Sequence, residues 1–117
     1  MNTNPSVEKS FEFAIRIVNV YKYLVAEHKE YVMSKQLLRC GTSIGANVSE
    51  AQRGQSKADF AAKMSIALKE ANETGYWLEL LNRTGYIDEA QYKKLNAACT
   101  SLRVMLVSSI RTAKGDK

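Results

Sequence analysis

Apolar side chains recur at intervals of three and four residues in four stretches of the 117-residue chain. This spacing places them on one face of an α-helix, because the helix completes a turn about every 3.6 residues. The pattern predicts helices over about residues 5–29, 34–53, 57–83 and 89–113. The expected inward face of the first helix is formed by Val7, Phe11, Ala14, Val18, Tyr21 and Val25.

The other three predicted helices each carry a comparable apolar face. The second is expected to face inward through Leu37, Gly41, Ile44, Val48 and Ala51, the third through Phe60, Met64, Ala67, Leu68, Ala71, Gly75 and Leu78, and the fourth through Tyr92, Leu95, Cys99, Leu102, Leu106 and Ile110.

Short polar segments separate these helices and carry signals for helix ends. Asn4, Ser56 and Asp88 stand where side chains cap helix N-termini, and Gly85 follows the third helix. Short connections force neighbouring helices to run antiparallel, and no alternating pattern competes as a sheet. We therefore predict an all-α fold, an up-down-up-down antiparallel four-helix bundle, in a single domain over residues 1–117.

The first and third helices carry more apolar residues than one inward face requires. A second stripe of this size is more typical of an interface than of a solvated surface, so we expect a homo-oligomer. Packing within one chain is the alternative that would also bury these residues. The expected interface residues are Phe13, Ile17, Val20, Leu24, Ile66, Trp77 and Leu80.

The chain offers little material for catalysis or metal binding, since it has one histidine and two cysteines. His28 stands near the end of the first helix, where an ordinary surface histidine is a better interpretation than a general base. Cys40 and Cys99 fall on or beside apolar faces and are expected in the core. We predict no catalytic residue, no metal and no cofactor.

Carboxylates of the third helix form a second candidate for chemistry. Glu70 and Glu73 are three residues apart and so are neighbours on the helix surface, where Asn47 and Glu50 of the second helix could reach them. Such a cluster could hold a proton or a hard cation, which keeps a metal-dependent enzyme as an alternative. We expect these four residues to form a polar network that fixes helix register or a subunit contact.

Positive charge is unevenly distributed along a chain whose formal net charge is +5. Residues 33–57 contain four Lys or Arg and one acid, Glu50, and the last helix adds further cations. A basic stripe opposite a core face suits contact with a phosphate backbone. The predicted phosphate contacts are Lys35, Arg39, Arg53 and Lys57.

The polar N-terminal segment and the absence of a long apolar run argue against a signal peptide and a membrane span. Two isolated cysteines suit a reducing compartment. We expect a cytoplasmic protein without membrane contact.

Residues 36–52 (QLLRCGTSIGANVSEAQ), 56–60 (SKADF), 66–71 (IALKEA) and 73–78 (ETGYWL) resemble the four-helix-bundle proteins encoded in intervening sequences of bacterial 23S rRNA genes. The resemblance implies the same bundle fold. Relatives include the accessory variability protein of diversity-generating retroelements, a basic homopentamer that binds nucleic acid and a reverse transcriptase. The resemblance thus implies a ring, with a pentamer as the leading oligomer, and supplies no catalytic residue.

Together these observations predict a non-enzymatic homo-oligomer that binds structured RNA or DNA through its basic surface. The alternative is a protein-interaction adaptor that docks a partner enzyme such as a reverse transcriptase.

Overall fold

Four α-helices account for nearly all of residues 4–115, the part of the chain that the structure, a computed structural model, describes. They are α1 (Pro5–His28), α2 (Met33–Ala51), α3 (Lys57–Arg83) and α4 (Glu89–Ala113), and these residues contain no strand. The prediction of an all-α, four-helix fold is therefore confirmed. Side-chain oxygens of Asn4, Ser56 and Asp88 accept hydrogen bonds at the starts of α1, α3 and α4, as their positions suggested.

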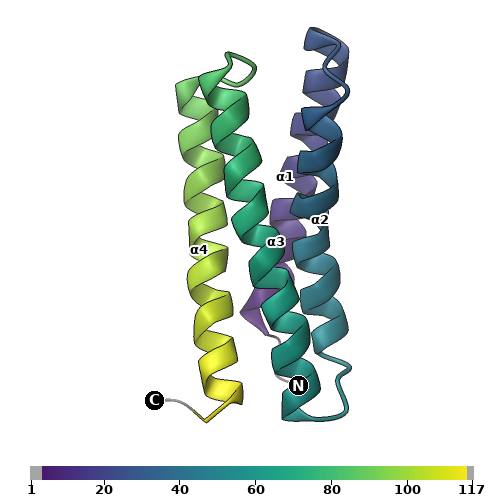
Figure 1. Ribbon diagram of the computed structural model, residues 1–117, viewed down its shortest axis with the longest axis vertical. Helices are drawn as coiled ribbons and strands as arrows, with labels where there is room; N and C mark the ends of the chain where they lie inside the picture. The colour runs from purple at the N-terminus through teal and green to yellow at the C-terminus, as the bar shows by residue number, and fades with distance from the viewer. Residues whose placement is uncertain (1–3, 116–117) are drawn as a thin grey trace.

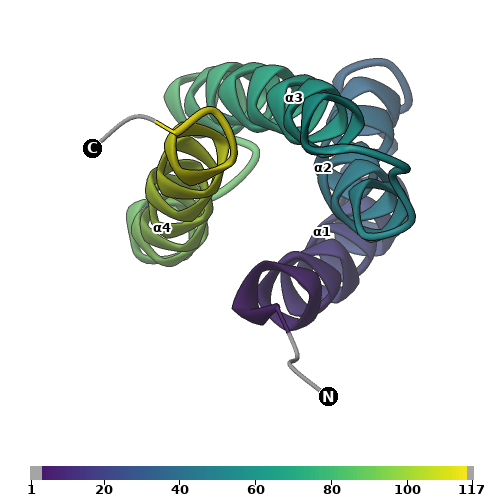
Figure 2. The ribbon, with the colours of Figure 1, turned by 90° about the horizontal axis from the view of Figure 1, so that it is seen from below.

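The helices run alternately up and down, roughly parallel to the long axis of the molecule (Figure 1). The molecule is 45 Å long and 23 Å wide. Seen along this axis, they follow one another in chain order, so α1 and α4 are also neighbours (Figure 2). The α1–α4 pair makes much less contact than the three pairs joined by loops. Both described chain ends and the α2–α3 loop lie at the same end of the bundle (Figure 1).

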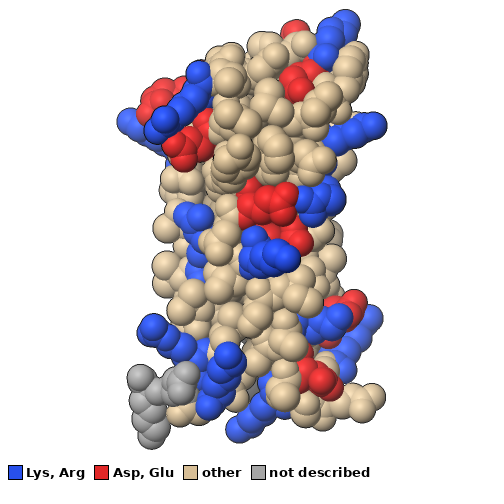
Figure 3. All heavy atoms as spheres, viewed as in Figure 1, with Lys and Arg blue, Asp and Glu red and all other residues tan. Residues whose placement is uncertain are grey.

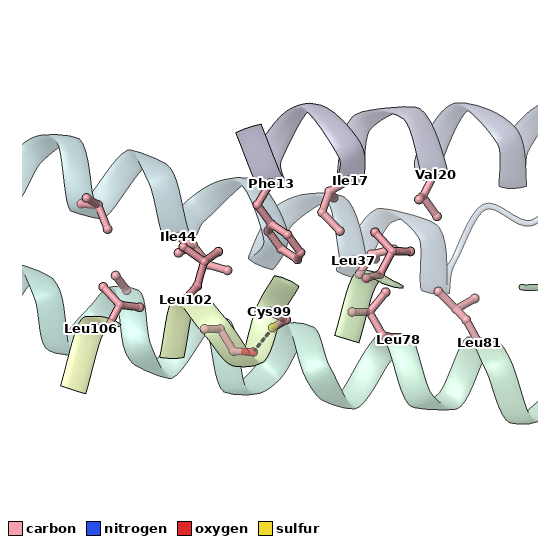
Figure 4. Close-up of a cluster of buried hydrophobic side chains, with 14 of the residues drawn as sticks. Phe13, Ile17, Val20, Leu37, Ile44, Leu78, Leu81, Cys99, Leu102 and Leu106 are labelled. Carbon is pink, nitrogen blue, oxygen red and sulfur yellow. Dashed lines mark hydrogen bonds between the residues drawn. The ribbon is translucent and has the colours of Figure 1, made fainter. Parts of the chain in front are cut away.

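The core is a single cluster of apolar side chains that all four helices supply (Figure 4). The predicted inward faces of α2 and α4 are confirmed at their centres, where Leu37, Ile44, Cys99 and Leu102 are no more than 2% exposed. The Cys99 thiol donates a hydrogen bond to the Ala71 carbonyl oxygen at 3.3 Å. Both cysteines are free and buried.

The prediction for the two faces of α1 is wrong. Phe13, Ile17, Val20 and Leu24 were expected at an oligomer interface, yet they lie in the core of the single chain and are at most 5% exposed. Phe11, expected in the core, is 64% exposed. These four side chains are therefore not free to contact a second subunit in this conformation.

Two buried serines explain why the apolar pattern of α1 predicted the wrong inward face. The buried face of α1 continues downward from Phe13 through Ser10 and Ser6, which are 0% and 2% exposed. Because these two positions are polar, the apolar stripe that faces the core begins only at Phe13 in the sequence, whereas the other apolar stripe begins at Val7. Small side chains are needed there because the backbone of α2 comes close. A Cβ added at Gly45 would lie 3.2 Å from the Ser10 carbonyl oxygen.

The side chain of Glu30, a residue that precedes α2, caps the N-terminus of this helix. The N-cap position is Val32, which has no side-chain acceptor. The Glu30 carboxylate replaces it by accepting hydrogen bonds from the backbone N–H groups of Val32, Met33 and Ser34 at 3.1, 3.0 and 2.7 Å. Partial burial opposes ionisation of this carboxyl, but the backbone hydrogen bonds outweigh it and lower the Glu30 pKa.

Replacing Glu30 with Gln should reduce the free energy of unfolding by about 1 kcal/mol at neutral pH, the usual size of a helix-cap contribution. Because folding lowers the pKa of this group, its contribution is complete above the unfolded-state pKa and is lost as the pH falls through the folded-state value. Urea unfolding of both proteins at several pH values measures this difference. Glu27→Gln is the matched control, and an equal loss in both variants would contradict the capping role.

Candidate nucleic-acid interface

Arg39 does not present a free charge to solvent, because two carboxylates of α3 hold it. Its Nη1 lies 3.3 Å from Glu70 Oε1, and its Nη2 pairs with Glu73 Oε2. The indole Nε1 of Trp77 donates to the same Glu73 oxygen at 3.3 Å. The group ties the middle of α2 to the middle of α3, and acidic and basic side chains alternate there on the face seen in Figure 3.

The predicted polar network is only half formed. Glu70 and Glu73 come together through Arg39, whereas the two α2 members bond elsewhere. The Glu50 carboxylate pairs with Lys63 Nζ at 2.5 Å, and this hydrogen bond and charge lower the Glu50 pKa. The Asn47 amide donates to the Ser43 carbonyl oxygen of its own helix at 2.8 Å. Glu50 therefore belongs to a separate contact between α2 and α3.

The four predicted phosphate contacts do not form one patch. Lys35 and Arg39 lie on the first half of α2, whereas Arg53 and Lys57 flank the loop after it. Arg39 and Arg53 are about 20 Å apart along the bundle, since each helical residue adds about 1.5 Å. The loop pair and the Lys35–Arg39 pair therefore belong to different parts of the surface.

A compact group of cations does form at the loop end of the bundle. Lys57 begins α3, Lys114 follows α4, and both line one groove together with Ala61, Ala62 and Ala113. Arg53 lies in the loop at the same end, where Figure 3 shows Lys and Arg side chains gathered. We call Arg53, Lys57 and Lys114 the basic end.

The basic end differs from Arg39 in the state of its charges. In the part of the chain that the structure describes, no carboxylate lies within 4.0 Å of the charged nitrogens of Arg53, Lys57 or Lys114. Their charges are thus available to an external anion. Lys114 was not among the predicted contacts, although the up-down topology alone places the end of the fourth helix beside the start of the third.

A second set of cations borders the seam between α1 and α4. One opening there is lined by Lys9, Glu12 and Arg16, and a second by Arg16 and Lys94. Charge counts along the sequence missed this set, because acids in the same stretch of α1 cancel Lys9 and Arg16. Only the pairing of α1 with α4 brings Arg16 near Lys94.

The side chains with catalytic potential are engaged in structure. The His28 ring contacts Tyr23 and Tyr86 edge to face, with centroids 5.3 and 5.4 Å away, and its Nε2 lies 3.1 Å from the Tyr23 hydroxyl. Burial raises the pKa of the Cys99 thiol to about 11 and also raises that of Cys40, which disfavours the nucleophilic thiolate.

Residues 4–115 lack two larger-scale features, a cluster of metal ligands and a membrane-spanning helix. No three His, Cys, Asp or Glu side chains gather closely enough to hold a metal ion. None of the described helices combines the length and the apolar character that crossing a membrane requires.

The geometry of residues 4–115 defines a class of small all-α proteins: four-helix bundles that carry a group of cations at one end. Comparison with known families narrows this class. Residues 3–108 match the model of the 23S rRNA-intervening sequence protein family, and the chain belongs to that family. No curated protein matches the chain.

A solved structure supports both the fold and the family. It is the crystal structure of a protein of unknown function from the S23 ribosomal protein family of Bacteroides thetaiotaomicron. The two sequences are 60% identical over 91% of this chain and 98% of the other, with a TM-score of 0.90. Neither the family nor this neighbour indicates a catalytic activity.

Arg39 and Glu73 should contribute jointly to stability. We expect a coupling of about 0.5–1 kcal/mol in a double-mutant cycle of Arg39→Ala and Glu73→Gln, because the pair is half exposed but belongs to a larger network. Urea unfolding of the four proteins gives this value. The exposed Arg83–Glu79 pair, 2.8 Å apart on α3, is the control and should couple more weakly. Equal coupling in both pairs would contradict a special role for the Arg39 network.

Proposed function

We propose that this protein binds the phosphate backbone of structured RNA or DNA through its basic end, without catalysing a reaction. The observation that carries the proposal is the convergence of Lys57 and Lys114 on one groove, free of carboxylate partners in the described part of the chain. Lysine ammonium groups contact phosphates as point charges and need no base-specific geometry.

The neighbourhood of the groove holds charges of both signs, with cations in excess. Lys57 stands in the first turn of α3, where the helix dipole places partial positive charge, and the end of α4 carries the opposite dipole charge. Arg53 adds a third cation at the same end of the bundle, and Asp59 in the first turn of α3 adds an acid. Glu50, the acid nearest to this loop on α2, is already paired with Lys63 and so offsets these charges less than a free carboxylate would.

We also propose that the protein acts as a homo-oligomer, with a pentameric ring as the expected form. Support comes from large apolar side chains that one chain leaves exposed, among them Phe11 and Val104, both 64% exposed. Each subunit of a ring would present one basic end, and several weak phosphate contacts on one nucleic acid would then add to its affinity.

The proposal is tested by fluorescence anisotropy of a labelled RNA hairpin and a DNA duplex over a range of salt concentrations. Lys57→Glu/Lys114→Glu should weaken binding and make the salt dependence shallower by about 2 for each subunit in contact, since each lysine–phosphate contact releases about one counterion. Circular dichroism checks that the fold is retained.

Lys22→Glu/Lys69→Glu is the matched control, because it makes the same change of charge on exposed helix positions away from the basic end. It should leave most of the affinity intact. Equal weakening by both variants would mean that overall charge, and not the basic end, governs binding. Unchanged binding by the Lys57/Lys114 variant would overturn the proposed site.

A protein-interaction adaptor is the second candidate, and exposed apolar residues on α3 favour it. Ile66 and Tyr76 are 42% and 60% exposed on this helix. Trp77 and Leu80, the other α3 residues expected at an interface, are partly buried, and Trp77 packs against the core. In this case, a single partner protein should remain bound after nuclease treatment and be lost with Tyr76→Asp, while Lys57→Glu/Lys114→Glu retains it.

A further inference from the structure

The side of α1 that faces away from the core is both apolar and acidic in its first half. Phe11 and Ile15 are 64% and 50% exposed, although both are large apolar side chains. Glu8 and Glu12 are exposed beside them at helical spacing. We call these four residues the α1 outer face. Solvent contact of this kind is unfavourable for the two apolar side chains, which makes the face a candidate for burial against a partner.

The side of α4 that faces away from the core is apolar and basic. Val104 and Val107 are 64% and 36% exposed and line one hollow on α4. Arg103 and Arg111 line the same hollow. We call these four residues the α4 outer face. Gly75 of α3 leaves room for one of the arginines, since a Cβ there would lie 3.0 Å from Arg103 Nη1.

The charges on both outer faces lack partners of opposite sign. Within residues 4–115, no Lys or Arg lies within 4.0 Å of the carboxylates of Glu8 or Glu12, and no carboxylate lies that close to the guanidinium groups of Arg103 or Arg111. Among the described residues, Arg103 donates a hydrogen bond to a neutral group, the Thr100 hydroxyl, at 2.9 Å. Each face as defined thus combines two apolar side chains with two charges of one sign, and the signs are opposite, while Glu12 also lines the α1–α4 opening beside Lys9 and Arg16.

The two faces cannot meet within one chain, because both point away from the shared core. We propose that the α1 outer face of one copy packs on the α4 outer face of a second copy. Such a contact joins two different surfaces and leaves one of each free, so it can be repeated from copy to copy and closes into a ring when the rotation allows. Phe11 and Ile15 would be covered by Val104 and Val107, with glutamates facing arginines.

The inference rests on the self-association part of the proposed function and names the surfaces that would form it. It uses neither Lys57 nor Lys114, so phosphate binding and assembly can be tested separately. It also replaces the α1 interface predicted from the sequence, whose members Phe13, Ile17, Val20 and Leu24 are in the core.

Sedimentation velocity over a wide range of concentrations tests the pairing by exchanging charges. Arg103→Glu/Arg111→Glu gives a chain with two acidic faces, and Glu8→Lys/Glu12→Lys gives a chain with two basic faces. Each variant alone should associate about a hundredfold more weakly than the unchanged protein, because like charges then face each other. A chain that carries all four substitutions should assemble again, since its two faces keep opposite signs whatever the number of subunits in the ring.

Lys35→Glu/Lys69→Glu controls for net charge and should assemble normally. If the unchanged protein assembles and either two-residue variant does so equally well, or if the four-residue variant stays apart, the pairing of these faces is overturned while the proposed self-association stands. If the unchanged protein is a monomer throughout, self-association itself fails. Phosphate binding is then judged on its own by the RNA anisotropy of the Lys57/Lys114 variant.

Discussion

The close approach of α1 to α2 is the constraint on which the rest of the structure depends. A Cβ at Gly41 would lie 2.8 Å from Ile17 Cγ2, a distance that a well-packed core does not accommodate without a shift. Gly41 therefore lets Ile17 pack directly on the α2 backbone, and Gly45 does the same for the Ser10 turn. Once this side of α1 is inside, Phe11 and Ile15 must be outside, and the molecule gains an exposed apolar face that it would otherwise lack.

The antiparallel topology places one cation of α2 beside carboxylates of α3 and brings other cations together at one end of the bundle. Arg39 faces the middle of α3, where Glu70 and Glu73 hold it, and it contributes to the α2–α3 contact instead of to an external ligand. Lys57 and Lys114 are far apart in the sequence, but each stands where a helix meets the same end of the bundle. The formal charge of +5 is thus less informative than the positions of the cations, since Arg39 is held by carboxylates whereas, within the described residues, Lys57 and Lys114 are not.

Helical spacing and capping residues were sufficient to predict the four helices and most of the core. They were not sufficient for α1, because two apolar stripes share its surface and spacing alone does not say which one faces inward. The serines at positions 6 and 10 belong to the inward face through packing against α2, which depends on contacts between residues distant in the sequence. Gly41 and Gly45 stand four residues apart on α2, a spacing typical of close approach between helices, but this spacing does not indicate which side of α1 meets them.

The site was less predictable than the fold for a similar reason. Arg39 and Lys57 are both cations in the same basic stretch of the sequence. Only their neighbours in the fold distinguish them, because Arg39 is paired with carboxylates of α3. The spacing of Glu70 and Glu73 predicted that they are neighbours. Their expected partners on α2 were Asn47 and Glu50, whereas the structure pairs them with Arg39. Lys114 could have been found from the sequence by placing helix ends in space, since an up-down bundle brings the fourth helix end beside the third helix start.

Hydrogen exchange of the protein with and without a structured RNA hairpin tests the central claim most directly. The account predicts slower amide exchange in the loop between α2 and α3 and at the end of α4, where Arg53, Lys57 and Lys114 would contact phosphates. Slower exchange confined to the opposite end of the bundle, or to the seam between α1 and α4, would contradict it.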